Sequence, residues 1–371
     1  MIYLDNNATT CLDPEVKQFV FSLLDDSYPL LGNPSSTHSF GRKAKKLVRE
    51  SIENIKSFFN TSYFEVLFTS GATEALNTLI NSLPSGHIIS SSIEHPSVIE
   101  PLKRLDNCIS FLDPLPGNGT IVLSQIEENI KTNTVALVLG SVNSETGAKL
   151  PLEEIAQFAK ERNLIFIVDG VSSVCKEEIN LFEGISAFCF SSHKIHSLGG
   201  TGVVLLHPSF RIKPFLLGGH QQLGKRAGTE NVLSIAALGY ALKITKPKLL
   251  DIIHKISILR DYLENSLLNT ISDIEIHSFK YPRICNISNI AFLGLEGEIL
   301  QASLDLEGVS VGYGTACSSG ITSFNSSLIY TGISAEEAAS SLRFSLSRFS
   351  TKEEIDEVLK ILINVVLRLR S

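Results

Sequence analysis

Three polar segments of the sequence each follow a short apolar run, and their side chains could bind and activate a small ligand. Residues 68–75 read Phe-Thr-Ser-Gly-Ala-Thr-Glu-Ala, which predicts a strand end, a small polar turn and a helix start. The free backbone N–H groups at a helix start form a site suited to phosphate. Ser and Thr also favour this position as ordinary helix caps, so this segment alone leaves both interpretations open.

The other two segments carry an acid and an amine. Asp169 follows the apolar residues 166–168, where a carboxylate either caps the next helix or balances a cationic ring nitrogen. Lys194 follows the apolar residues 187–190 within Ser-Ser-His-Lys, and a lysine amine can form an imine with a carbonyl compound. Most lysines instead lie on the surface. His193 and His196 have no nearby Cys or carboxylate and are therefore a weak candidate for a metal site.

Considered together, the three segments predict a pyridoxal phosphate enzyme. Such an enzyme needs a phosphate cradle, a lysine that holds the aldehyde as a Schiff base, and an acid that keeps the pyridine nitrogen protonated. The protonated ring then draws electrons from the substrate carbon. Lys194 and Asp169 supply the last two groups, and the turn at 68–75 supplies the cradle.

A sheet has to bring these segments together. From about residue 65, apolar runs alternate with helical patterns such as residues 74–83 and 152–162. This alternation predicts a parallel sheet covered on both faces, with ligands bound at the carboxyl ends of its strands. The expected strands are residues 66–68, 87–89, 135–139, 164–168, 187–190 and 203–206.

Helix signals flank this region on both sides. Asp-Pro-Glu at 13–15 predicts a capped helix start, and a second helix with a solvated basic face is expected over residues 42–59. The alternation of apolar runs and helical patterns ends at about residue 245. A long helix follows Lys246-Pro247, and a final amphipathic helix is expected from about Thr351, with acids first and arginines last. This part of the chain predicts a second, smaller α/β domain.

Composition excludes several classes of protein. The chain has 371 residues, 43% of them hydrophobic, and a formal net charge of −7, so no global positive field would attract nucleic acid. No apolar run reaches the length of a membrane span, and the N-terminus does not read as a signal peptide. The six cysteines are scattered without any Cys-x-x-Cys, which predicts free thiols in a reducing, cytoplasmic compartment.

Seven motifs occur in an order that resembles the NifS/IscS-type cysteine desulfurases, which are fold type I pyridoxal phosphate enzymes of the class V aminotransferase group. The motifs are Tyr-Leu-Asp-Asn-Asn-Ala-Thr-Thr at 3–10, Gly-Asn-Pro-Ser-Ser-x-His at 32–38, Thr-Ser-Gly-Ala-Thr-Glu at 69–74, Glu-His at 94–95, Ser-x-His-Lys at 191–194, Arg-x-Gly-Thr-Glu-Asn at 226–231 and Arg-Phe-Ser-Leu at 343–346. The resemblance implies an α/β fold with a mainly parallel seven-stranded sheet between helices. It implies a large cofactor domain over residues 14–248, and a small domain formed by residues 1–13 and 249–371.

The resemblance also implies roles for individual residues. Lys194 would be the Schiff-base lysine, Asp169 the partner of the pyridine nitrogen, and His95 a ring-stacking residue that helps to move protons. The expected cofactor-binding residues also include Ala72, Thr73, Asn143, Ser172, Ser191, His193 and, from the other subunit of a homodimer, Thr229. The expected metal content is none.

On the same basis, the substrate would be L-cysteine and the product L-alanine. Arg343 would pair with the substrate carboxylate, a task suited to a guanidinium, and Asn143 would lie near the substrate. Cys317, within the small-residue run at 312–320, would accept the sulfur as a persulfide. An iron–sulfur scaffold or a sulfur-carrier protein would then receive the sulfur, with no direct membrane or nucleic-acid binding.

Several positions depart from the family pattern and leave alternatives open. Ser172 replaces a Gln, and this shorter side chain puts contact with the cofactor's phenolic oxygen in doubt. Ser144 stands where a second Asn is common, and Tyr313 and Thr315 replace serines before Cys317. The alternatives are a selenocysteine lyase, another class V pyridoxal phosphate enzyme, or a platform that mainly docks sulfur-acceptor proteins.

Overall fold

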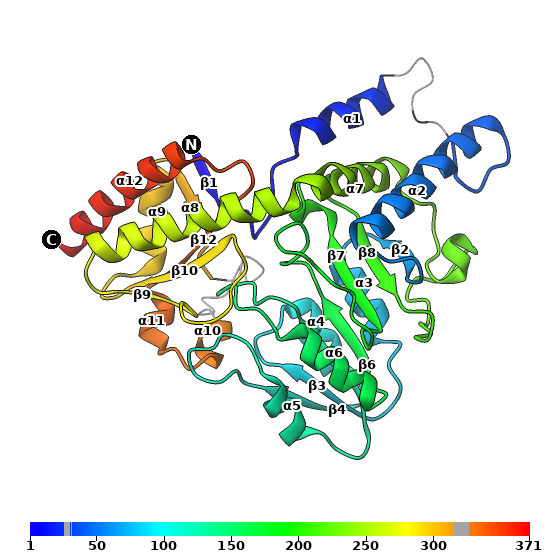
Figure 1. Cartoon of the computed structure of the whole chain (residues 1–371), viewed down its shortest axis with the longest axis horizontal. Coiled ribbons are helices and arrows are strands. Elements are labelled where there is room, and N and C mark those ends of the chain that lie inside the picture. Colours follow the sequence, from blue (N-terminus) through cyan, green and yellow to red (C-terminus); the bar gives the residue numbers. More distant parts are fainter. Residues whose placement is uncertain (26–29, 31, 315–325) are drawn as a thin grey trace.

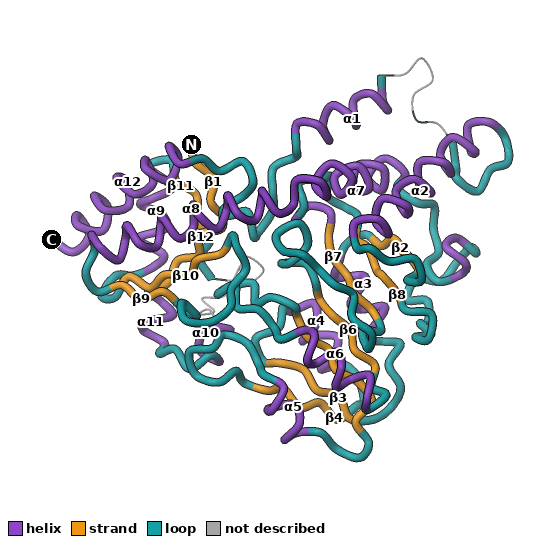
Figure 2. Tube along the Cα trace, viewed as in Figure 1, coloured by secondary structure: helices purple, strands orange, loops and turns teal. Residues whose placement is uncertain are grey.

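The computed structural model describes residues 1–25, 30, 32–314 and 326–371, and these residues form an α/β fold (Figures 1 and 2). The helices are α1 Pro14–Leu24, α2 Ser39–Phe58, α3 Ala72–Ile80, α4 Pro96–Lys103, α5 Leu123–Asn129, α6 Leu152–Glu161, α7 Val232–Thr245, α8 Leu249–Thr270, α9 Gly297–Leu306, α10 Ser326–Tyr330, α11 Ala335–Ala339 and α12 Lys352–Arg370. Figure 1 shows α8 running from the larger sheet toward the smaller one, where both termini lie.

The larger sheet has seven strands in the order β2-β8-β7-β6-β5-β3-β4. The strands are β2 Glu65–Thr69, β3 His87–Ser91, β4 Cys108–Leu112, β5 Thr134–Gly140, β6 Ile165–Asp169, β7 Ala187–Ser191 and β8 Gly202–Leu206. Only β8 is antiparallel to its two neighbours, whereas the other neighbouring pairs are parallel. The mainly parallel seven-stranded sheet expected from the sequence is confirmed.

Helices cover both faces of this sheet because successive strand residues point to opposite sides. Along β6 and β7, Phe166, Val168 and Phe188 pack with residues of α2, α6 and α7. Ile167 and Cys189 point the other way, into a cluster with residues of α3 and α4. Both faces are therefore apolar, which explains why these strands read as unbroken hydrophobic runs.

The C-terminal part of the chain forms two smaller sheets together with the first residues. An antiparallel sheet has the order β12-β10-β9, and a parallel pair joins β1 to β11. These strands are β1 Ile2–Leu4, β9 Ile274–Ile276, β10 Ile287–Phe292, β11 Val309–Val311 and β12 Ser341–Ser345. They pack with α8, α9 and α12 around a hydrophobic cluster of their own. The division into residues 14–248 and the remainder stays a prediction.

The helix signals of the sequence have direct structural counterparts. Asp13 caps α1 by accepting hydrogen bonds from the backbone of Glu15 and Val16. Thr351 caps α12, and Glu354 completes the capping box. The second helix begins at Ser39 rather than at the expected residue 42, because the His38 ring accepts a hydrogen bond from the Gly41 backbone and caps it earlier.

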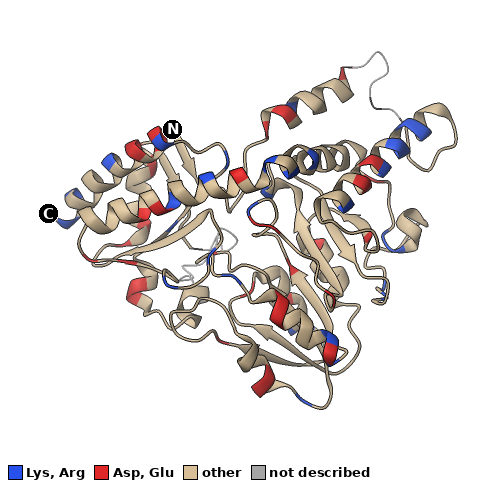
Figure 3. Ribbon diagram, in the orientation of Figure 1, with Lys and Arg blue, Asp and Glu red and all other residues tan. Residues whose placement is uncertain are grey.

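Acidic and basic side chains are interspersed over the molecule, and α2 carries several basic ones (Figure 3). Within the described ranges 1–25, 30, 32–314 and 326–371, no helix is long and apolar enough to cross a membrane.

Candidate active site

A cavity of about 260 Å³ opens at the carboxyl ends of the central strands of the large sheet. The last residues of four strands line it, namely Ser91, Gly140, Asp169 and Ser191. This is the edge at which parallel sheets bind ligands. The expected site residues that line the cavity are Ala72, Thr73, His95, Asn143, Asp169, Ser172, Ser191, His193 and Lys194. Thr229 and Arg343 do not line it, and Cys317 lies outside the described residues.

The N-terminus of α3 forms one end of this cavity. The Ser191 hydroxyl accepts a hydrogen bond from the Ala72 backbone N–H at 2.8 Å, which joins the helix start to the end of β7. First-turn N–H groups have no partner within their own helix, so this end can bind an anion. The turn is held further by Glu74, which accepts the Ser70 N–H at 2.7 Å and pairs with Arg226 at 2.9 Å.

Lys194 lies on a short 3-10 helix that follows β7 directly. Its Nζ atom donates a hydrogen bond to the carbonyl oxygen of Asn7, a residue of the N-terminal segment. Burial, together with the nearby positive charges of Lys176 and Arg343, lowers the pKa of Lys194 to about 8. A lysine amine with this pKa is more easily obtained in its neutral, nucleophilic form than an exposed one.

Asp169 is the last residue of β6 and faces the same cavity. One of its oxygens accepts the Val171 backbone N–H at 2.9 Å, which orients the carboxyl group. Burial raises the pKa of Asp169 above the usual carboxyl value, and only the Val171 hydrogen bond and nearby His95 and Lys194 counteract this. A cationic group placed in the cavity would therefore be a favourable partner for this carboxylate.

His95 caps α4 and is open to the cavity. Its Nδ1 atom accepts the backbone N–H of Ser97 at 3.1 Å, so the proton of the neutral ring is on Nε2. Burial lowers the pKa of His95, although Asp169 opposes this effect. The ring is thus neutral at pH 7 and can exchange a proton through Nε2.

His193 and Asn143 complete the polar lining. Burial lowers the pKa of His193 to about 4, helped by the charges of Lys194 and Lys176, so this ring is also neutral. The Asn143 side-chain oxygen accepts the backbone N–H groups of Glu145 and Thr146 at 2.9 and 2.8 Å. Its Nδ2 group is buried and has no hydrogen-bond partner among the described residues. The structure therefore holds a donor ready for a ligand atom.

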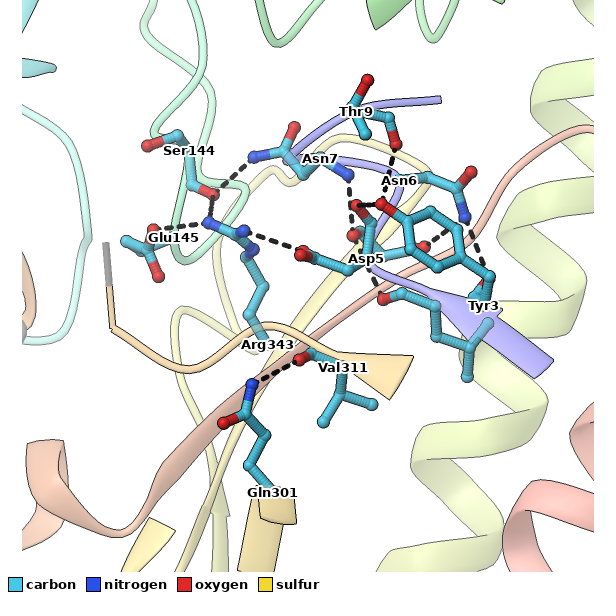
Figure 4. Close-up of polar contacts among 12 residues, drawn as sticks. Tyr3, Asp5, Asn6, Asn7, Thr9, Ser144, Glu145, Gln301, Val311 and Arg343 are labelled. Carbon is cyan, nitrogen blue, oxygen red and sulfur yellow. Dashed lines mark hydrogen bonds and ion pairs between the residues drawn. The ribbon is translucent and has the colours of Figure 1, made fainter. Parts of the chain in front are cut away.

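Arg343, on β12, is buried among carboxylates rather than open to the cavity (Figure 4). Its Nη1 atom lies 2.5 Å from Glu145 and its Nη2 atom 3.0 Å from Asp5. The Nη1 group also donates to the carbonyl oxygen of Ser144 at 3.2 Å, whereas Nε has no partner in the described structure. Through these contacts, Arg343 links its own strand β12 to the N-terminal segment and to the loop after β5, next to the cavity.

Two residues at the site were not assigned a role from the sequence. Glu94 lines the cavity and accepts the Gly140 backbone N–H at 2.9 Å, and burial raises its pKa to about 8. Lys176 is 6% exposed and lies behind Lys194. Glu94 could have been suspected because it stands next to His95, but Lys176 carries no sequence signal, since only burial distinguishes it from a surface lysine.

Among the described residues, no group of three or more His, Cys, Asp or Glu side chains lies so that it could hold a metal ion.

Comparisons with known proteins relate the whole chain to one family. The family model described as "Aminotransferase class-V" matches residues 2–358. A cysteine desulfurase of Trichormus azollae is 37% identical, with 100% of this chain and 94% of the relative covered. The cysteine desulfurase NifS of Azotobacter vinelandii is 33% identical over 100% and 94% of the two chains. The solved structure of a NifS-like protein from Rickettsia africae superposes with a TM-score of 0.90, at 29% identity, over 98% of this chain and 99% of that one.

Proposed function

The chain belongs to the class-V aminotransferase family and is a cysteine desulfurase, and we propose that it binds pyridoxal 5′-phosphate in the cavity at the end of the large sheet. The observation that carries this proposal is the convergence of three groups on one cavity. These are the N-terminus of α3, the Asp169 carboxyl group and the Lys194 amine. Each of them is suited to a different part of that cofactor.

The residues present fit the cofactor. Ala72, Thr73, Ser191 and His193 lie at the anion-binding end of the cavity and are suited to the phosphate. Burial raises the pKa of the Asp169 carboxyl group, and a cationic ring nitrogen beside it would lower that pKa again. The unpartnered Asn143 Nδ2 donor suits the phenolic oxygen of the cofactor. Ser172 also lines the cavity, at the position where the family pattern has the longer Gln. When bound, the cofactor supplies an electron sink for the substrate α-carbon.

The chain's own residues handle the protons of the reaction. Lys194 would hold the cofactor through Nζ, and its amine, once free, would move a proton to and from the substrate α-carbon. His95 has its proton on Nε2, on the side of the ring away from Ser97, and exchanges it with the substrate. The pKa of Lys194 is lowered to about 8, so its neutral amine is easily reached near pH 7, whereas the neutral His95 ring carries a proton on Nε2 that it can donate.

The sulfur leaves the substrate through Cys317. Its thiolate attacks the sulfur of L-cysteine, so an S–S bond forms while the Cβ–S bond of the substrate breaks. The bonding electrons of the Cβ–S bond stay on the carbon, which is protonated to give L-alanine. Overall, L-cysteine and the Cys317 thiol become L-alanine and a Cys317 persulfide. An iron–sulfur scaffold or a sulfur-carrier protein is the proposed acceptor of that sulfur.

Arg343 is the proposed partner of the substrate carboxylate, but its guanidinium already contacts two acids. Glu145 and Asp5 contribute two negative charges against one positive charge. The substrate carboxylate must therefore take the place of Glu145, which is the closer of the two, or use the unpartnered Nε group. A guanidinium can bind a carboxylate through two parallel hydrogen bonds.

We also propose a cytoplasmic homodimer in which Thr229 reaches the phosphate of the partner subunit. Thr229 is exposed and does not line the cavity of its own chain. Nearby Leu217 and Leu223 are each 85% exposed, and Phe215 is also exposed. Exposed apolar groups of this size support an interface on this side of the molecule. Free thiols on all described cysteines are consistent with a reducing compartment.

The central test is the substitution Cys317→Ala. We expect the purified variant to keep the visible absorbance of its Lys194-bound cofactor but to lose about 1,000-fold or more in alanine formation from L-cysteine. Mass spectrometry after incubation with L-cysteine should find a persulfide at Cys317 only in the wild type. Lys194→Ala is the matched variant, which should lose both the absorbance and the turnover.

Other outcomes of these measurements support the alternatives. Unimpaired alanine formation by Cys317→Ala contradicts the sulfur-transfer step. Faster alanine formation from selenocysteine that survives the same substitution favours a selenocysteine lyase. A wild-type protein that stays colourless with added pyridoxal phosphate favours a platform that mainly docks sulfur-acceptor proteins.

A further inference from the structure

A buried lysine without a counter-charge lies directly behind the proposed cofactor lysine. Lys176 lies in the turn after β6 and is only 6% exposed. Its Nζ group donates a hydrogen bond to the backbone carbonyl oxygen of Lys194 at 3.3 Å. On the other side, the Cys285 thiol donates to the carbonyl oxygen of Lys176 at 3.1 Å. Lys176 therefore connects the turn after β6 to the Lys194 segment and to the residues before β10.

No acid balances the charge of Lys176 among the described residues. The neighbouring Glu177 is 2.6 Å from Lys149. Asp13, on the N-terminal segment, lies 2.7 Å from Arg348. The void between Lys176, His196 and Arg348 measures about 10 Å³, which holds at most one water and no counter-ion. A buried ammonium without an acidic partner is costly.

The other titratable groups that face Lys176 cannot neutralise it either. Cys175 and Cys285 stay protonated because burial raises the pKa of their thiols to about 11 and about 12. His196 is neutral because burial and the charge of Arg348 lower its pKa to about 3. The charged form of Lys176 therefore has no balancing acid among these groups, and burial lowers the pKa of Lys176 itself.

Lys194 is the group on which this charge acts most directly. It is faced by Asp5 and Arg343 from the N-terminal segment and β12, by Asp169 from β6, and by Lys176 from behind. Asp5 already pairs with Arg343, and Asp169 lies across the cavity. After burial, the charge of Lys176 contributes most to the lowered pKa of Lys194.

We propose that Lys176 is an electrostatic positioning residue whose buried ammonium disfavours protonation of the Lys194 nitrogen and so favours the neutral, nucleophilic form of that nitrogen. This inference rests on the proposed role of Lys194 as the cofactor lysine. The geometry carries it, since Lys176 contacts the Lys194 backbone, has no acidic partner in the described structure and is enclosed without room for one. Like charges in a medium of low dielectric constant disfavour each other's charged form.

The test compares Lys176→Met, which keeps the length of the side chain and removes its charge, with Lys176→Arg, which keeps the charge. In each cofactor-loaded protein, the visible absorbance is titrated against pH to find where the Lys194 nitrogen loses its proton. We expect the midpoint of Lys176→Met to lie roughly one pH unit or more above that of the wild type. The midpoint of Lys176→Arg should stay close to that of the wild type.

A second measurement needs no cofactor. The reaction of Lys194 with an amine-selective acetylating reagent is followed against pH by mass spectrometry in the ligand-free proteins, with the exposed Lys280 as an internal reference. The half-maximal pH for Lys194 should rise in Lys176→Met by the same amount, while that for Lys280 stays constant.

The two failures can be told apart. An unchanged Lys194 midpoint in Lys176→Met, in either measurement, overturns the proposal and leaves Lys176 with a purely structural role. If Lys176→Met does not take up the cofactor, the labelling midpoint of Lys194 decides in the same way. A wild-type protein that shows no visible cofactor band contradicts the proposed function instead. The labelling midpoint of Lys194 still tests the role of Lys176 in that case, because it is measured without the cofactor.

Discussion

Glu94 illustrates how burial sets the chemistry of a single residue at this site. Its carboxyl group lies against the end of β5, where it accepts the Gly140 N–H at 2.9 Å. Burial, with some help from the charge of Asp169, raises its pKa to about 8. The proton that the folded protein holds at pH 7 is therefore absent from the same residue in the unfolded chain, whose carboxyl pKa is about 4.5. This difference makes stability depend on pH.

The sign of that dependence follows from the proton count. Between about pH 4.5 and pH 8 the folded state binds more protons than the unfolded state, so stability falls as the pH rises. Glu94→Gln keeps an acceptor for Gly140 and removes the titration. Between about pH 5 and pH 9, the unfolding free energy of the ligand-free variant should rise relative to that of the wild type by on the order of 4 kcal/mol.

Urea unfolding at the two pH values measures this difference. The exposed Glu127→Gln on α5 is the control, and its unfolding free energy should follow that of the wild type at both pH values. A difference between Glu94→Gln and the wild type that is the same at both pH values would contradict the protonated state of Glu94.

At the scale of elements, the phosphate end of the cavity depends on how closely β8 approaches the turn between β2 and α3. Gly202 pairs with Thr69 on one side and with Ser191 on the other. A Cβ atom at Gly202 would lie 2.4 Å from the backbone of Gly71 and 2.6 Å from the Thr69 hydroxyl. Because the first of these is backbone, the turn itself would have to move.

We therefore expect Gly202→Ala to weaken binding of pyridoxal phosphate by about tenfold or more, since overpacking of this kind costs about 1–3 kcal/mol. Titration of the ligand-free protein with the cofactor measures the effect. Gly199→Ala is the matched control, because its Cβ would meet nothing closer than the His193 side chain at 4.0 Å. Equal affinity of Gly202→Ala and Gly199→Ala would show that the turn does not bind the phosphate.

Across the whole molecule, the proposed site draws on segments that are far apart in the chain. Arg343 joins Asp5 from the first residues, Glu145 from the loop after β5 and its own strand β12 (Figure 4). Lys194 likewise contacts Asn7 from the N-terminal segment and Lys176 from the turn after β6. The N-terminal segment therefore contacts both functional regions, and the proposed dimer adds Thr229 of a second copy to each site.

Subunit mixing tests that arrangement. Lys194→Ala removes the proposed cofactor lysine, and Thr229→Asp places a negative charge where the partner's phosphate is proposed to lie. Differently tagged copies of the two variants are co-expressed, and the mixed dimer is isolated. In it, one site combines an intact Lys194 with an intact Thr229, so we expect about half of the wild-type activity from two nearly inactive parents. A mixed dimer as inactive as its parents would show that Thr229 does not complete the partner's site.

The sequence alone determined the class of the fold and the positions where its chemistry could lie. Short apolar runs that alternate with helical patterns are typical of strands buried on both faces, and the side chains after such strands meet at one edge of a parallel sheet. Asp169, Lys194 and the turn before α3 were found in this way, and the structure brings them to one cavity. Local hydrogen bonding likewise placed the starts of α1 and α12, because Asp13 and Thr351 act within their own turns.

Other features depended on the tertiary structure. The edge strand β4 was missed, because only its last residue is buried and its sequence has no continuous apolar run. The raised pKa of Glu94, the Glu145–Arg343 pair and the position of Lys176 behind Lys194 each depend on burial or on contacts between distant segments. A sequence pattern reports which residues share a face or a turn, whereas desolvation and charge–charge distance exist only after the chain has packed.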